Sequence, residues 1–84
     1  MKLTAPEAPA VRPLAAICRA ARQANCGECW QVPGKPCTPE GDHVARFGRA
    51  VRRGLISGVE LVSVLGTFDV FTTATIVRTP GGAR

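Results

Sequence analysis

The sequence predicts a small zinc-stabilised domain that is mainly α-helical with minor β structure. Three observations lead to this fold class. Three cysteines and the only histidine gather in a Pro- and Gly-rich stretch at residues 26–43, helical spacing of apolar residues flanks that stretch, and one β-type segment lies near the C-terminus. The predicted order is a helix, a zinc knuckle, an arginine-rich helix, a short helix and a C-terminal strand.

The chain is short for a self-sufficient hydrophobic core. It has 84 residues, and although 45% of them are apolar, only three are Phe, one is Trp and none is Tyr. A domain of this size is marginally stable unless a metal, a disulfide or a partner reinforces it. A structural zinc ion contributes about 10–16 kcal/mol in zinc-finger peptides, which is enough to decide whether such a chain folds.

We interpret the chain as one domain between two flexible ends. Residues 1–12 show little periodicity and are predicted to form a flexible N-terminal arm, and residues 79–84 a Pro- and Gly-containing tail. A single zinc-stabilised domain is therefore predicted over residues 13–78, with the zinc knuckle at residues 26–43.

Two helices are predicted, one on each side of the knuckle. The first spans residues 13–24, with Pro13 at an early helical position. The second spans residues 42–53, with Asp42 as the N-cap and Gly54 as the stop. Its basic side chains are expected on the solvent face, opposite the apolar positions; they are Arg46, Arg49, Arg52 and Arg53.

After the second helix, residues 59–65 are compatible with either a helix or a strand. Ser57 and Glu60 match a capping box and favour a short helix to Leu65, although residues 59–65 would also suit a strand. Residues 68–77 are rich in Thr, Val, Ile and Phe and are predicted to form a strand. Its pairing partner is left open among the knuckle, residues 59–65 and a second protomer.

The spacing of cysteine and histidine in the knuckle is typical of a metal site. Cys26 and Cys29 are separated by two residues, Cys37 follows after seven more, and His43 follows after another five. Thiolates and imidazole nitrogen are preferred ligands of tetrahedral zinc, and an irregular loop needs such a crosslink to hold its shape. The pattern therefore predicts one structural Zn²⁺ ion.

Several nearby residues have two interpretations. Cys18 lies in phase with the apolar stripe of the first helix, which favours a core position, but it could instead replace His43 as the fourth ligand. Trp30 either covers the metal site or is a single core aromatic. Pro33 and Gly34 suit the central positions of a type II turn.

The net charge and the lack of recognisable targeting signals limit the classes of partner that we expect. The net charge is +5, and nine of the eleven basic residues are Arg, which favours a polyanion but fits nucleic acid, a membrane surface or an acidic protein; GC-rich codon usage would give the same bias. We recognise neither a signal peptide nor a transmembrane segment, so we expect a cytoplasmic protein with reduced thiols and no membrane partner. Two disulfides are the alternative if the compartment is oxidising.

Residues 26–46 resemble the phage-type DNA-binding zinc fingers of actinobacteria and their phages. The shared elements are the Cys-x2-Cys pair, the Pro-Gly-x-Pro-Cys segment at residues 33–37, and a His followed shortly by Arg46. This resemblance implies DNA as the partner and a set of four zinc ligands, Cys26, Cys29, Cys37 and His43. The four cysteines of the chain also resemble those of WhiB-like iron–sulfur regulators, but the spacings differ and the Gly-Trp-rich turn of that family is missing.

Catalysis finds little support in the sequence. Four protein ligands would close the metal site, and the only histidine is then bound to metal, so we expect neither an enzyme nor a small-molecule substrate.

Two functional hypotheses remain. The first is a small basic regulatory or accessory factor that binds nucleic acid, with double-stranded DNA as the expected form. Its contacts would be phosphate-directed side chains of the second helix and the knuckle: Arg46, Arg49, Arg52, Arg53 and Lys35. The second is a zinc-stabilised protein-interaction module without nucleic-acid binding, which uses the strand at residues 68–77 as an exposed edge.

Overall fold

The computed structural model describes residues 11–80, which form three helices and a two-stranded sheet in the order α1, β1, α2, α3 and β2. The helices are α1 (Leu14–Ala21), α2 (Val44–Arg52) and α3 (Gly58–Leu65), and the strands are β1 (Gly41–His43) and β2 (Ile76–Arg78). The expected element order is therefore present. The outer parts of the predicted arm and tail, residues 1–10 and 81–84, lie outside the described residues.

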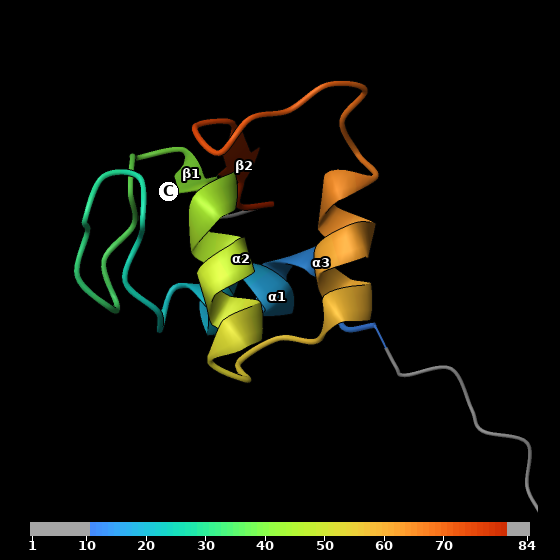
Figure 1. Ribbon diagram of the computed structural model, residues 1–84, viewed down its shortest axis with the longest axis horizontal. Coiled ribbons are helices and arrows are strands. Elements are labelled where there is room, and N and C mark those ends of the chain that lie inside the picture. The colour runs from blue at the N-terminus through green and yellow to red at the C-terminus, as the bar shows by residue number, and fades with distance from the viewer. Residues whose placement is uncertain (1–10, 81–84) are drawn as a thin grey trace, which may run out of the picture.

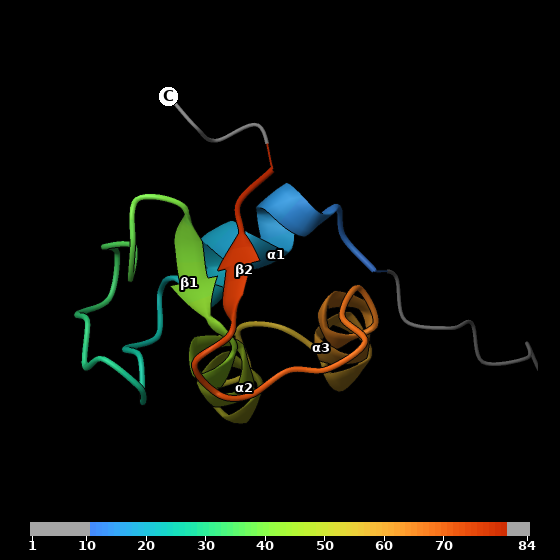
Figure 2. The same ribbon diagram turned by 90° about the horizontal axis from the view of Figure 1, so that it is seen from above.

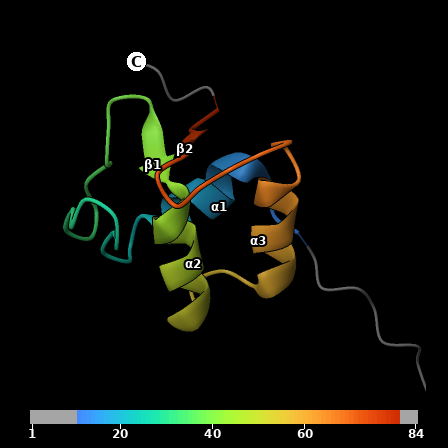
Figure 3. The same ribbon diagram turned by 45° about the horizontal axis from the view of Figure 1, so that its top comes forward.

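Helix α2 is the centre of the arrangement. It lies between the irregular knuckle on one side and α3 on the other, and α1 crosses behind it (Figure 1). The two strands lie side by side near the start of α2 (Figure 2), and the segment after α3 passes over the helices to reach β2 (Figure 3). Because α2 has neighbours on two sides, it buries more than one face.

The core between the helices is built from small and medium-sized side chains. Phe47 and Ala50 of α2 are fully buried, and Ile17 of α1 and Val64 of α3 are almost so. Cys18 is also fully buried in this cluster, which confirms its predicted core position. None of the helices between residues 11 and 80 is long and apolar enough to cross a bilayer.

Helix α1 ends earlier than predicted, at Ala21 instead of residue 24. Pro13 serves as its N-cap residue, and the chain leaves the helix through tight turns in which the N–H groups of Gln23 and Ala24 bond to carbonyls three residues back. This tightened exit directs the chain from the core into the knuckle.

Helix α2 begins two residues later than predicted, and Asp42 is not its N-cap. Asp42 lies in β1, and the N-cap position belongs to His43, which makes no side-chain capping bond. The first N–H groups of α2 are satisfied by backbone carbonyls instead, because Val44 donates to Thr75 and Ala45 to Thr73. A distant loop thus caps the helix and frees the Asp42 carboxylate for another role.

The predicted stop of α2 is confirmed. The N–H of Gly54 bonds to the Val51 carbonyl, and the N–H of Leu55 reaches back to the Ala50 carbonyl. This pair of bonds is the Schellman arrangement, and Gly54 has the positive φ of 75° that it requires.

No packing contact explains why residue 48, in the middle of α2, is a glycine. It is not among the glycines with positive φ, and a Cβ added there would meet no atom within 4 Å. A glycine inside a helix is less favourable than alanine by about 1 kcal/mol. The helix would therefore be more stable with a side chain at this position.

The residues after Ser57 form a helix and not a strand. Ser57 accepts a hydrogen bond from the Glu60 N–H at 3.0 Å, and the Glu60 carboxylate accepts one from the Ser57 N–H, so the predicted capping box is present. Glu60 also binds Arg12, whose Nε lies 2.7 Å from a carboxylate oxygen. The Arg12 guanidinium holds the pKa of Glu60 well below its ordinary value. Arg12, although it belongs to the predicted arm, is therefore fixed against α3.

The predicted strand at residues 68–77 is mostly wrong, because only Ile76–Arg78 forms one. Ahead of it, the Thr72 N–H bonds to the Thr75 hydroxyl and the Ala74 N–H to the Thr72 hydroxyl, which gives the backbone a local turn in place of a sheet. Of the three partners considered, the knuckle is the correct one. Strand β2 pairs antiparallel with β1, with Asp42 opposite Val77.

The capping box gives a direct test of α3. Ser57→Ala removes the acceptor for the Glu60 N–H and should lower the free energy of unfolding by about 1 kcal/mol. Ser63→Ala is the control because Ser63 lies exposed on the same helix, and its effect should stay within about 0.5 kcal/mol. Chemical denaturation of both variants measures the difference, and equal effects would contradict the capping role.

Candidate metal centre

Four side chains from residues 26–43 meet at one point. The Sγ atoms of Cys26, Cys29 and Cys37 and a ring nitrogen of His43 all lie within 4.8 Å of one another. The Cys26 Sγ and the His43 Nδ1 are 3.6 Å apart. A tetrahedral zinc ion with ordinary Zn–S and Zn–N bonds would hold these two ligand atoms about 3.6 Å apart. The donor set and the spacing therefore fit one metal ion.

The first two cysteines are arranged by a tight backbone turn. The Trp30 N–H bonds to the Cys26 carbonyl at 3.0 Å, and the Cys26 N–H bonds to the Gln31 carbonyl at 3.0 Å. Inside this turn, the Glu28 N–H points at the Cys26 Sγ at 3.3 Å. An N–H group aimed at sulfur stabilises the thiolate form that a metal requires.

Opposite pKa shifts of two thiols indicate crowded sulfurs. Burial acts to raise the pKa of Cys26, but the backbone N–H groups of Cys29 and Glu28 and the neighbouring thiols together lower it. Burial raises the pKa of Cys37 to about 12, aided by the nearby thiols of Cys26 and Cys29 and opposed by the backbone N–H of His43. Sulfurs this close do not all ionise together unless a cation compensates their charge. A divalent metal supplies that charge.

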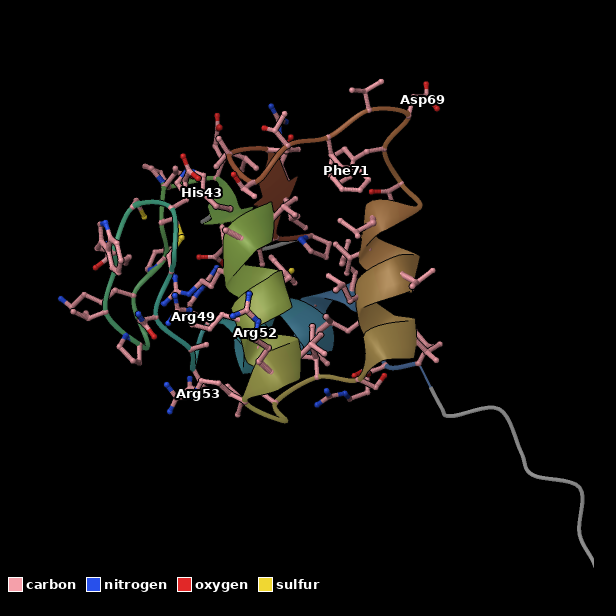
Figure 4. All side chains as sticks on the ribbon, viewed as in Figure 1. His43, Arg49, Arg52, Arg53, Asp69 and Phe71 are labelled. Atoms are coloured by element: carbon pink, nitrogen blue, oxygen red, sulfur yellow. The ribbon has the colours of Figure 1, made fainter. Side chains whose placement is uncertain are left out.

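The other two ligands are positioned by the turn into β1. The Cys37 N–H donates to the Asp42 Oδ1 at 2.9 Å, and the Thr38 N–H donates to the Gly41 carbonyl at 2.9 Å. Gly41 has no room for a side chain, because a Cβ there would overlap the Val77 carbonyl of β2. Strand β1 then ends at His43, the fourth ligand candidate. Figure 4 shows His43 at the start of α2, on the knuckle side.

Arg46 is the main link between the knuckle and the rest of the protein. Its side chain is fully buried, and its Nη1 lies 2.8 Å from the Asp42 Oδ1. The same nitrogen also contacts the Cys37 Sγ at 3.6 Å. The guanidinium also binds four backbone carbonyls, two just before the knuckle (Arg22 and Ala24) and two inside it (Val32 and Lys35).

Asp42 supplies the negative charge that this buried cation needs. It is fully buried, and its second oxygen accepts hydrogen bonds from the Arg22 Nε at 3.1 Å and Nη2 at 2.9 Å. Arg22 also donates to the Thr79 hydroxyl at 3.0 Å, which fixes the first residue of the predicted tail. Two arginines and one aspartate thus join α1, the knuckle, β1 and α2.

The predicted solvent position of Arg46 is therefore wrong. The knuckle packs over this part of α2 and buries the side chain, so that Arg46 offers no free donor for a phosphate. Arg52, Arg53 and Lys35 are exposed, and Arg49 is partly exposed. The spacing of four residues between Asp42 and Arg46 is the sequence signal that could have identified the internal pair.

Two predictions about the other knuckle residues have different outcomes. Val32 and Lys35 close a turn through a hydrogen bond of 3.3 Å, and Gly34 has φ of 89°, as a type II turn requires. Trp30, however, is neither a cover for the metal site nor a core residue, because 72% of it is exposed. Its φ of 64° is unusual for a bulky residue and follows from the tight cysteine turn.

The position of Cys18 decides between Cys18 and His43 as the fourth ligand candidate. Cys18 lies in the helical core and outside the group formed by the other three cysteines and His43. Among the described residues, the four cysteines therefore do not gather around one point as an iron–sulfur cluster with Cys18 would require.

Comparison of the chain with protein-family models, with curated proteins and with solved structures finds no match in any of the three. The resemblance of residues 26–46 to the phage-type fingers therefore remains a prediction from the motif alone.

Metal removal tests the centre directly. We expect one metal ion per chain and loss of the folded state on chelation, because the Arg46 contacts alone would not hold the two cysteine-bearing turns of the irregular knuckle together. Cys37→Ser should abolish metal binding, whereas Cys18→Ala should keep full stoichiometry. Elemental analysis and circular dichroism measure both, and a metal-free chain that stays folded would contradict the structural role.

A second test addresses the buried Asp42–Arg46 ion pair while the metal site is kept saturated with zinc. Arg46→Met keeps most of the side-chain volume but leaves Asp42 without part of its countercharge and several carbonyls without donors. Breaking such a buried pair should lower the free energy of unfolding by about 3–5 kcal/mol. Arg52→Met, an exposed position on the same helix, should change it by less than about 0.5 kcal/mol. Denaturation at saturating zinc measures both variants, and equal effects would contradict the role of Arg46 as a link.

Proposed function

We propose that the protein is a small zinc protein that binds double-stranded DNA through α2 and the adjoining knuckle, as a regulatory or accessory factor. The zinc ion has a structural role in this proposal. Three cysteines and one histidine complete a tetrahedral site, which leaves no open position for a substrate or an activated water. The observation that supports the DNA-binding part is the division of the arginines into two groups.

The first group of arginines is used inside the protein. Arg12 is paired with Glu60, and Arg22 and Arg46 are both paired with Asp42. These three side chains also bind backbone carbonyls or a hydroxyl, so their donors are largely occupied. They contribute to stability and not to a recognition surface.

The second group is free to meet an external anion. Among residues 11–80, five arginines form no ion pair with an acidic side chain, and three of these, Arg49, Arg52 and Arg53, lie together along α2 and at its C-terminal end. Their spacing of three and four residues puts them on one side of α2, and Figure 4 shows them in succession along that helix. Lys35 adds an exposed cation from the neighbouring knuckle.

The fold supports the use of these side chains as phosphate contacts. The metal and Arg46 fix the knuckle to one side of α2, so the three arginines project from a helix that is held on two faces. Guanidinium groups suit bidentate contact with phosphate oxygens. Contacts of this kind position a protein on the duplex with little sequence preference.

Salt dependence tests this proposal. If Arg49, Arg52, Arg53 and Lys35 each neutralise one phosphate, the plot of log affinity against log salt concentration should have a slope of about −3.6. Arg49→Ala combined with Arg53→Ala should reduce the slope by about 1.8. Fluorescence anisotropy of a labelled short duplex, titrated with the zinc-loaded protein at several salt concentrations, measures both slopes.

A matched control comes from another exposed arginine. Arg19 lies on α1, which crosses behind α2 in Figure 1, so Arg19→Ala should leave the slope unchanged. Absence of duplex binding at low salt, or an equal effect of Arg19→Ala and the double variant, would reject DNA binding through α2.

A further inference from the structure

A groove crosses α2 from Gly27 and Glu28 of the knuckle to α3, and its chemistry is mixed; we call it the α2–α3 groove. It has a volume of about 410 Å³, with Val44, Leu61 and Leu65 among its apolar lining residues. Arg49 and Arg52 line it from α2, and Gly48 lies between them and Val44 along the helix. Figure 4 shows Arg52 in front of α2 and Arg49 at its knuckle side.

Gly48 explains why the groove is open. No neighbouring atom comes within 4 Å of the place where its Cβ would stand, and its backbone does not need a glycine. Any larger residue at this position would project into the groove and reduce its volume. The missing side chain weakens the helix and leaves this space free for a ligand.

The charges around the groove select the kind of ligand. Arg49 and Arg52 have no ion-pair partner among the described residues, and they line the same groove as the apolar side chains of Leu61 and Leu65. The one acidic residue of the lining, Glu28, accepts a hydrogen bond from the Thr73 hydroxyl at 2.9 Å. A complementary ligand therefore carries carboxylates next to a large apolar group.

We propose that the α2–α3 groove binds an acidic peptide segment that inserts a Leu-sized apolar side chain over Gly48 and pairs its carboxylates with Arg49 and Arg52. A nucleic-acid backbone has no apolar group for Leu61 and Leu65, so it would use the arginines and leave the groove empty. Desolvated apolar anchors beside charged contacts are typical of peptide-recognition grooves. This site adds a protein partner to the proposed DNA contact and does not depend on that contact.

The test uses a short synthetic peptide of Glu and Leu residues with the full, zinc-loaded chain. Labelled-peptide anisotropy should show saturable binding, and replacement of Leu by Ser at unchanged peptide charge should weaken it at least about tenfold. Replacement of Glu by Gln should weaken it similarly. A Ser-containing peptide that binds as tightly as the parent would reduce the interaction to nonspecific charge attraction and overturn the proposal.

Two variants of Gly48 complete the experiment. Gly48→Leu fills the groove with the protein's own side chain and should weaken peptide binding at least about tenfold, whereas Gly48→Ala should weaken it less than about threefold. Both should melt at a higher temperature than the parent, which shows that they are folded. Unchanged peptide affinity of Gly48→Leu, or no saturable binding by the parent, would overturn the groove proposal. Duplex binding by Gly48→Leu should be retained, so a failure of DNA binding is recognised separately.

Discussion

The buried contact between Arg46 and Asp42 is the constraint on which the arrangement of the chain depends. Residues 26–40 contain neither helix nor strand, so their backbone carbonyls have few regular partners. One guanidinium in the first turn of α2 binds two of these carbonyls, those of Val32 and Lys35, and two more from the segment just before the knuckle. An arginine can be buried in this way only because Asp42 lies 2.8 Å from it and is itself held by Arg22. The knuckle, the sheet and α2 therefore share one polar centre.

The metal site and this polar centre crosslink different parts of the same loop. The metal would join side chains from residues 26 to 43 near the start of α2, whereas Arg46 joins main-chain groups of residues 22–35. Neither the metal nor Arg46 alone would fix both parts of this loop. Their combination explains how a chain with a core of mostly small side chains can hold a long irregular segment in place. Phe47 is the only aromatic residue that is fully buried among the described residues, so apolar burial by itself contributes little to the stability of the fold.

Local signals in the sequence predicted local features well. The cysteine and histidine spacing identified the four side chains that converge, Ser57 and Glu60 identified α3, and Gly54 identified the end of α2. The burial of Arg46 was not predictable from periodicity, since helical phase separates an apolar face from a polar one but cannot tell that a second segment covers the polar face. The strand predicted at residues 68–77 was too long for a related reason. Thr72 and Thr75 have high strand propensity, but their hydroxyls bind their own backbone and form the turn whose neighbouring carbonyls cap α2.

The division of arginines also connects the two proposed binding modes. Among residues 11–80, Arg49 and Arg52 are the cations that belong both to α2 and to the groove with Leu61 and Leu65. A phosphate and a peptide carboxylate cannot occupy the same guanidinium donors together, because each bidentate contact uses two of them. An acidic segment seated over Gly48 would therefore remove two of the duplex contacts and leave Arg53 and Lys35. By linkage, duplex binding would weaken peptide binding by the same factor. The glycine that costs α2 stability would then make the nucleic-acid affinity of this protein responsive to a protein partner.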